Sequence, residues 1–326
     1  MLWVMCLLVF PSFHSICQCS LSFPGGRRQE MREMLEQSVI TYRSKGWAES
    51  TKRTYRQHLQ CYLDFCHLLN IEPVPLSSEH SSLYLAYLAD FRGLCFASIR
   101  SYICIVRTLH KQHNLGDPFA LWTPHHVLQG MRRELGEEQH GATPVTPELL
   151  LALHSTLSWD NMFHCSVWAG CMIAFYGLLR SANFLCRSLS EAGKGKLLCV
   201  GDVSCHPQGA VITLHWTKTI QFRQKKVYVT LPSLEKSVLC PVTALTKLFY
   251  FHLQLKSQQK SALLRDEYDR PLLYSVFLDF VNSCLHRAGH ASVKLTGHSF
   301  RRGGAQWAAH MGLSHANIQE LGFLAQ

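Results

Sequence analysis

The apolar residues in the first third of the chain recur at helical spacing. Between residues 51 and 69 they fall three or four positions apart, which is the spacing of one buried helix face. These residues are Tyr55, Leu59, Tyr62, Leu63, Cys66 and Leu69. Ser50 or Thr51 would cap the start of this helix. The same spacing predicts helices over 78–90, 97–113 and 124–135, and hence a compact N-terminal helical bundle over residues 28–135.

The pattern changes after a short polar segment, residues 136–145, which we interpret as a linker between two domains. Thr146 and Pro147 are typical of a helix start, a capping residue followed by proline in the first turn. Alternating apolar residues then predict strands over 197–203, 210–216 and 226–231, among helices over 162–179, 241–251 and 275–288. The fold is expected to be mainly α with a small antiparallel β-sheet (α+β), with a second domain over residues 146–326.

Residues 1–27 stand apart from both domains. They contain an apolar run, LWVMCLLVF, which has the length of a signal peptide and is too short to span a bilayer. No Lys or Arg precedes the run, since the first basic residue is Arg27, and the chain has no Asn-x-Ser/Thr sequon. We interpret residues 1–27 as an apolar leader or an artefactual start, and favour an intracellular protein over a secreted one.

Composition narrows the class of protein. Apolar residues make up 47% of the chain and charged residues 17%, which excludes a disordered tail. The net charge of +10 favours a polyanionic partner such as DNA or RNA. Most of the 14 cysteines lie within apolar helix or strand patterns, where they are expected to be reduced core residues.

One short segment near residue 300 carries the first chemical hypothesis. It reads GHSFRRGG, and it places His298 and Arg301 three residues apart at an expected helix start, where both can contact one phosphate. The segment resembles the His-x-x-Arg box of the tyrosine recombinases, the phage-integrase family. In this family the arginine and histidine side chains bind the DNA phosphate at which the strand is exchanged.

Three further boxes occur in the family's order. The segment FYGLLR is similar to the box of the first catalytic arginine, which makes Arg180 that arginine, although Asn183 stands where the family usually has Glu. The segment WTKT is similar to the β-hairpin lysine box and points to Lys218 as general acid. The segment LCPVTAL, residues 239–245, resembles eukaryotic transposon-derived members of the DIRS and Crypton types.

The resemblance implies a covalent mechanism that needs neither metal nor cofactor. Two arginines would stabilise the charge on the non-bridging phosphate oxygens, the lysine would protonate the departing 5′ oxygen, and a tyrosine hydroxyl would attack. Cys17-x-Cys19 and the group Cys199, Cys205 and His206 lack the spacing of a structural zinc site, so no metal is expected.

The nucleophile is the part that does not match. The family has a Trp or His and then a Tyr after its His-x-x-Arg box, whereas this chain has no Tyr after Tyr274. We therefore expect a recombinase-type catalytic domain that is truncated, and a protein that binds DNA without cleaving it. The alternative is a fragment of an active site-specific recombinase.

The resemblance also implies contacts from the helical domain to double-stranded DNA. Lys52, Arg53 and Arg56 are expected to contact phosphates from one helix start and Arg100 and Arg107 from another helix, and Arg223 is expected to do so beside the hairpin lysine. Assembly into a homo-oligomer on DNA stays open, and the nucleus is the expected location, with no membrane attachment. The alternative from another class is a secreted or interaction protein that does not bind DNA.

Overall fold

The computed structural model describes residues 25–136, 143–192, 197–215 and 226–322, which form two compact units. Unit 1 spans Met1–Gln139 and unit 2 spans His140–Gln326. Within the described residues, no helix has both the length and the apolar character needed to cross a membrane. All described cysteines are free thiols, and most of them are buried.

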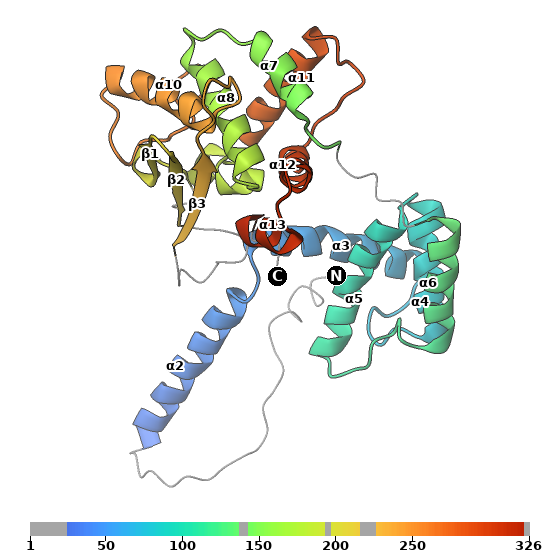
Figure 1. The fold of residues 1–326 in the computed structure, drawn as a ribbon. Helices are drawn as coiled ribbons and strands as arrows, with labels where there is room; N and C mark the ends of the chain where they lie inside the picture. The colour runs from blue at the N-terminus through green and yellow to red at the C-terminus, as the bar shows by residue number, and fades with distance from the viewer. Residues whose placement is uncertain (1–24, 137–142, 193–196, 216–225, 323–326) are drawn as a thin grey trace. The chain divides into compact units, whose positions relative to one another are not determined.

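Unit 1 consists of helices, as the apolar spacing predicts (Figure 1). Its elements are α2 (Gly25–Ser44), α3 (Glu49–Leu68), α4 (Ser78–Ala86), a π-helical turn (Tyr87–Phe91), α5 (Phe96–Gln112) and α6 (Trp122–Glu134). The predicted cap at Ser50 or Thr51 is wrong, because α3 begins at Glu49 and its N-cap is Ala48, which makes no side-chain capping bond. The aromatic rings of Tyr62, Phe65 and Tyr84 meet in the core between α3 and α4.

A buried histidine joins α5 to the segment before α4. The backbone N–H of Leu76 donates to His110 Nε2 at 2.9 Å, and His110 Nδ1 lies 2.9 Å from the carbonyl oxygen of Val106. Because Nε2 accepts, Nδ1 must carry the proton, so the ring is neutral and both nitrogens are satisfied. His110 therefore acts as a structural cross-link within unit 1.

Unit 2 is built around α8 (Met162–Tyr176), whose residues are buried on nearly all sides. The other elements are α7 (Pro147–Ser155), a 3₁₀ turn (Ser181–Asn183), α9 (Leu189–Ala192), a second 3₁₀ turn (Val200–Asp202), β1 (Val203–His206), β2 (Gly209–Leu214), β3 (Val227–Pro232), α10 (Pro241–Gln254), α11 (Tyr274–Arg287), α12 (Ser299–His310) and α13 (His315–Gly322). Thr146 caps α7 and Asn161 caps α8 through their side chains. Since α8 is apolar around its whole circumference, it can be stable only inside such a layer of helices and strands.

The three strands form one antiparallel sheet in the order β1-β2-β3. Alternate residues of β2 and β3 point into the core, which confirms the expected small sheet. The predicted strand over 197–203 is wrong, because this stretch contains a 3₁₀ turn and makes only an isolated bridge from Cys199 to Ala262, whereas pairing within the sheet starts at Val203. The Asp202 carboxylate accepts the backbone N–H of Cys199 at 2.8 Å, and this local hydrogen bond turns the chain before the strand can begin.

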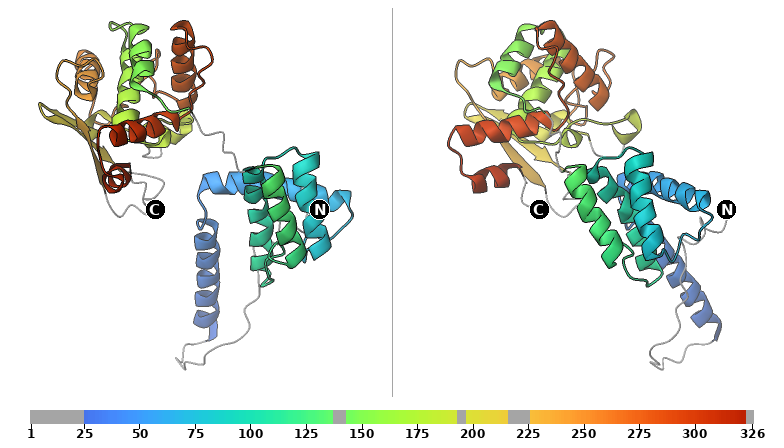
Figure 2. Two further views of the ribbon diagram at one scale, coloured as in Figure 1. Left: turned by 45° about the vertical axis from the view of Figure 1, so that its right-hand side comes forward. Right: turned by 90° about the vertical axis from the view of Figure 1, so that its right-hand side faces the viewer.

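Helix α12 crosses the end of α8 at very short range (Figure 2). Two adjacent glycines make this possible. A Cβ atom at Gly303 would overlap the backbone of Val145, and one at Gly304 would overlap the carbonyl oxygen of Phe175. Neither neighbour is the flexible end of a side chain, so the backbone itself would have to move.

We predict that Gly304→Ala destabilises unit 2 by about 1–3 kcal/mol, because a methyl group is forced against backbone. Gly130→Ala in α6 is the matched control, since nothing lies within 4 Å of the added Cβ there. At that exposed helical site alanine should stabilise the protein by roughly 0.5–1 kcal/mol. Urea unfolding of the two variants and the wild type measures both effects, and equal stability of Gly304→Ala and wild type would contradict the packing argument.

Candidate functional site

The C-terminal end of α8 has an unusual backbone conformation. Gly177 caps the helix, and the next residue, Leu178, has a φ of +49° although it is not glycine. This left-handed conformation costs about 1–2 kcal/mol for a residue with a Cβ. It turns the chain sharply after α8, and Leu178 itself is buried.

The carbonyl exposed by this turn binds an arginine from α12. Arg301 Nη1 donates to the Leu178 carbonyl oxygen at 2.7 Å, and only 7% of the Arg301 residue is exposed. Burial, and next the positive charge of Arg180, lower the pKa of Arg301 to about 10. The guanidinium is therefore still protonated at pH 7, as a buried cation in an electrostatically unfavourable place.

Arg180 lies two residues after Leu178 in the chain and is half-buried. Its backbone is extended, and its carbonyl accepts the N–H of Asn183 at 2.8 Å, which starts the 3₁₀ turn. Leu178, whose carbonyl binds Arg301, and Ser181, whose side chain lies against Gly297 just before α12, flank Arg180 in the chain. The charge of Arg180 is near enough to contribute to the lowered pKa of Arg301. Two guanidinium groups in one neighbourhood suit an anion with several oxygens, such as a phosphate.

A network of side chains holds the loop that leads into α12. The side-chain amide of Asn282 forms two hydrogen bonds with the backbone of Leu295. Its Oδ1 accepts from the N–H at 2.8 Å, and its Nδ2 donates to the carbonyl oxygen at 3.2 Å. The hydroxyl of Tyr274 accepts the N–H of Gly297 at 3.1 Å, and Ser299 Oγ accepts the N–H of Thr296 at 2.9 Å. The positioning roles of Tyr274 and Asn282 cannot be predicted from the sequence, because a residue that acts from another helix leaves no local pattern.

His298 lies at the N-cap of α12, one helical turn before Arg301, and is exposed. Its backbone N–H donates to Thr296 Oγ1 at 3.3 Å. The structure thus brings together Arg180 and Arg301 and places His298 near them along the helix. Lys218 and Arg223 lie outside the described residues; the pairing of β2 with β3 runs as far as Leu214 and Val227.

The basic residues of unit 1 fall into two groups. Arg53, Arg56 and Arg100 are exposed. Lys52 instead forms an ion pair with Glu49 at 2.6 Å, and Arg107 forms one with Asp117 at 2.8 Å.

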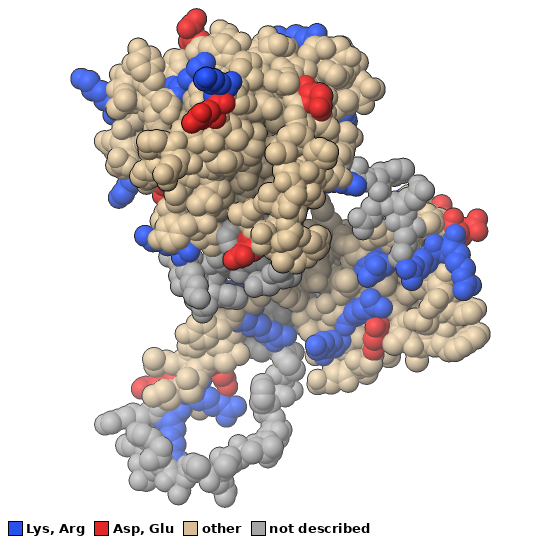
Figure 3. Space-filling model, viewed as in Figure 1, with Lys and Arg blue, Asp and Glu red and all other residues tan. Residues whose placement is uncertain are grey.

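Helical spacing puts Arg100, Arg107 and Lys111 on one face of α5, at positions i, i+7 and i+11. Figure 3 shows Lys and Arg side chains gathered over α5 and α6. A positive face of this kind suits the phosphates of a nucleic acid, although Asp117 neutralises part of its charge.

No known family model and no curated protein matches the sequence. The fold is similar to that of solved tyrosine recombinases and integrases. One is the Tn1549 transposon integrase in complex with transposon right end DNA, with a TM-score of 0.59 and 12% identity over 89% of this chain and 90% of that chain. Another is a lambda integrase dimer bound to a COC′ core site, with a TM-score of 0.57 and 13% identity over 89% and 90%. A third is the XerH recombinase bound to palindromic difH substrate, with a TM-score of 0.56 and 16% identity over 89% and 78%.

The paired arginines lead to a prediction about stability. Replacement of Arg180 by Gln removes a like charge beside buried Arg301, so the thermal midpoint of unit 2 should rise by about 2–4 °C, the shift that ~1 kcal/mol produces in a domain of this size. Sulfate should stabilise the wild type more than chloride does at equal ionic strength, and this advantage should shrink in Arg180→Gln. Arg187→Gln, a change at an exposed arginine of the same unit, is the control. Identical melting of the two variants in both salts would show that Arg180 and Arg301 do not form an anion site.

Proposed function

We propose that this protein is a tyrosine-recombinase relative that binds duplex DNA and holds one backbone phosphate between Arg180 and Arg301. The observation that carries the proposal is the hydrogen bond from buried Arg301, in the first turn of α12, to the Leu178 carbonyl two residues before Arg180. This bond brings Arg301 to the segment that carries Arg180, whose charge contributes to the lowered pKa of Arg301. The similarity of the fold to DNA-bound recombinases and integrases supports the same function.

Phosphate binding follows from the electrostatics of the site. Without an anion, the buried charge of Arg301 is opposed by Arg180, while the Leu178 carbonyl contributes to its solvation. A phosphate oxygen accepts hydrogen bonds from guanidinium groups in a planar, bidentate geometry and cancels the repulsion between them. His298 stands at the helix N-terminus, where the helix dipole also favours an anion.

The finer parts of the proposal concern lineage and partners. We place the protein in the eukaryotic transposon-derived branch on the strength of LCPVTAL, and we propose a nuclear location and assembly on DNA as expectations of that branch. The structure gives this segment a physical role, because Cys240 precedes α10 and its thiol accepts the backbone N–H of Leu234 at 3.3 Å. Cys240 and Pro241 thus fix the start of the helix that packs on α8.

We further propose that these 326 residues bind DNA without cutting it. The reaction of the family needs a tyrosine hydroxyl as covalent carrier, and the sequence has no Tyr after Tyr274. Tyr274 itself lies beside the site, but its hydroxyl is engaged by the backbone of Gly297 and supports the loop before α12. The arginines alone can bind a phosphodiester but cannot replace the nucleophile.

The first test measures binding as a function of salt. The affinity for a short duplex, followed by fluorescence anisotropy, should fall steeply with salt, and the double variant Arg53→Gln/Arg56→Gln should reduce the slope of log K against log salt by about 2, one phosphate contact per arginine. The control is Lys256→Gln/Lys260→Gln, which removes two exposed charges from unit 2 and should keep the slope. Absence of binding at low salt would refute the proposed function, whereas equal slopes would refute only the role of Arg53 and Arg56.

The second test concerns cleavage. On a nicked suicide substrate, the 326-residue chain should form no covalent protein–DNA adduct on a denaturing gel, because it lacks the attacking hydroxyl. Arg301→Ala should weaken binding to the same duplex about tenfold or more, the loss expected for one charge-assisted hydrogen bond. An adduct that survives denaturation would prove the active-enzyme alternative and overturn the proposed absence of cleavage.

A further inference from the structure

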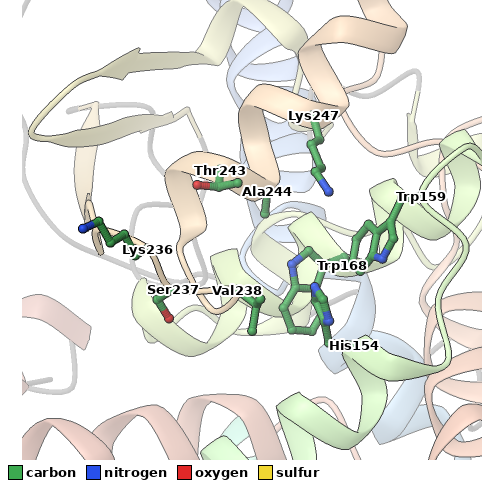
Figure 4. Close-up of a pocket in the computed structure, with 9 residues that line it drawn as sticks. All are labelled: His154, Trp159, Trp168, Lys236, Ser237, Val238, Thr243, Ala244 and Lys247. Atoms are coloured by element: carbon green, nitrogen blue, oxygen red, sulfur yellow. The ribbon is translucent and has the colours of Figure 1, made fainter.

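A second site lies on the other side of unit 2. A cavity of about 340 Å³ opens between α7, α8, α10 and the segment that precedes α10 (Figure 4). It borders the first half of α8 through Trp168, whereas Arg180 follows the opposite end of that helix. The residues around it are His154, Trp159, Trp168, Lys236, Ser237, Val238, Thr243, Ala244 and Lys247. The phosphate site does not use any of these residues.

Aromatic rings form one side of this cavity. The rings of His154 and Trp159 lie 4.4 Å apart, and Trp168 meets Trp159 edge-on with ring centres 6.2 Å apart. Burial, and next the charge of Lys247, lower the pKa of His154, so its ring is neutral at pH 7 and acts as aromatic surface. Such a surface suits a flat, unsaturated ring in a ligand.

Positive charge and hydroxyl groups form the other side. Lys247 points from α10 towards the two tryptophans, and its Nζ lies 4.4 Å from the Trp159 ring centre (Figure 4). Lys236 stands at the outer edge, and Ser237 and Thr243 add hydroxyls. No Asp or Glu is among the residues that line the cavity. A ligand that matches both sides is therefore aromatic at one end and anionic at the other.

The cavity is held open by fixed backbone. The bond from Leu234 N–H to Cys240 Sγ and a second from Leu239 N–H to Ser237 Oγ, at 3.2 Å, tie the segment before α10 to itself. Ala244 faces the cavity from α10 with only a methyl group, which leaves room that a larger side chain would fill. A preformed cavity of this size is within the range of small-molecule sites.

We propose that this cavity binds one nucleotide, with the base against Trp159 and His154 and the phosphate beside Lys247. Stacking on an indole is available to every base, and Lys247, whose Nζ lies over the Trp159 ring in the structure, turns from the ring to the phosphate when the base stacks there. A phosphate with its several oxygens can use both this lysine and neighbouring hydroxyls. A free nucleoside monophosphate and an unpaired nucleotide in a nucleic-acid strand present the same chemistry. The inference stands independently of duplex binding at Arg180 and Arg301.

The test is calorimetric titration of the full chain with AMP. AMP should bind, and adenosine and inorganic phosphate should each bind at least about tenfold more weakly, since each lacks one half of the ligand. Lys247→Gln and Trp159→Leu should each reduce the affinity for AMP at least about tenfold. Lys260→Gln and Arg187→Gln should leave AMP binding unchanged, because both residues are exposed and belong to neither site.

A competition experiment identifies the source of the nucleotide. A short oligothymidylate that competes with AMP in the wild type would identify a strand as the source of the nucleotide, and its failure to compete would identify a free nucleotide. No heat with AMP, equal affinity in Lys247→Gln, or a loss in Arg187→Gln instead would overturn the proposal, and none of these would affect the test of duplex binding.

Discussion

The hydrogen bond between Arg301 and the Leu178 carbonyl determines how unit 2 is arranged around its charged site. It needs three conditions at once: a left-handed leucine, a helix brought against backbone by two glycines, and a buried guanidinium. Each of these costs free energy when taken alone. Together they fix the ends of α8 and α12 against each other, and the bond to main chain helps to set the orientation of Arg301.

The cost becomes understandable if the site is completed by an anion. A ligand that binds the native state but not the unfolded state stabilises the protein. A site that is electrostatically unfavourable when empty can therefore be stable when it is occupied. Rigid support of the cations also reduces the entropy lost on binding, because Tyr274, Asn282 and Ser299 have already ordered the loop before α12. The proposed nucleotide cavity follows the same design, with Cys240 ordering the segment beside it.

Much of this architecture is encoded in apolar spacing and can be predicted. The helices for which the apolar spacing gives bounds and the last two strands agree with the structure to within a few residues, because long periodic segments identify buried faces. The sequence gives no bounds for α2, whose described side chains are mostly exposed. The strand predicted over 197–203 differs from the structure, because an apolar run within a strand and one that ends in a turn have the same sequence pattern. Only the structure shows that the Asp202 carboxylate accepts a hydrogen bond from the Cys199 N–H earlier in the chain. The predicted helix over 78–90 ends in a π-helical turn, and α13 has too few core residues to stand out.

The sequence suggests residues for the candidate site but not their geometry. The resemblance of the boxes to those of the recombinases points to Arg180 and Arg301, but Leu178 gives no warning of a positive φ, since leucine seldom adopts one. Nor could charge spacing show that Arg107 and Lys52 are engaged by Asp117 and Glu49. These pairings arise from distances across loops and turns, which a one-dimensional pattern does not contain.

The contact between Val145 and α12 has a mechanical consequence. The backbone N–H of Val145 donates to the Ser299 carbonyl at 3.0 Å, and Gly303 packs directly on the Val145 backbone. Val145 is also among the first residues through which the chain enters unit 2. The first turn of α12, the turn that carries Arg301, is thus anchored on the main chain of Val145. Because no flexible side chain lies between Gly303 and the Val145 backbone, a shift of Val145 would displace this turn instead of being absorbed.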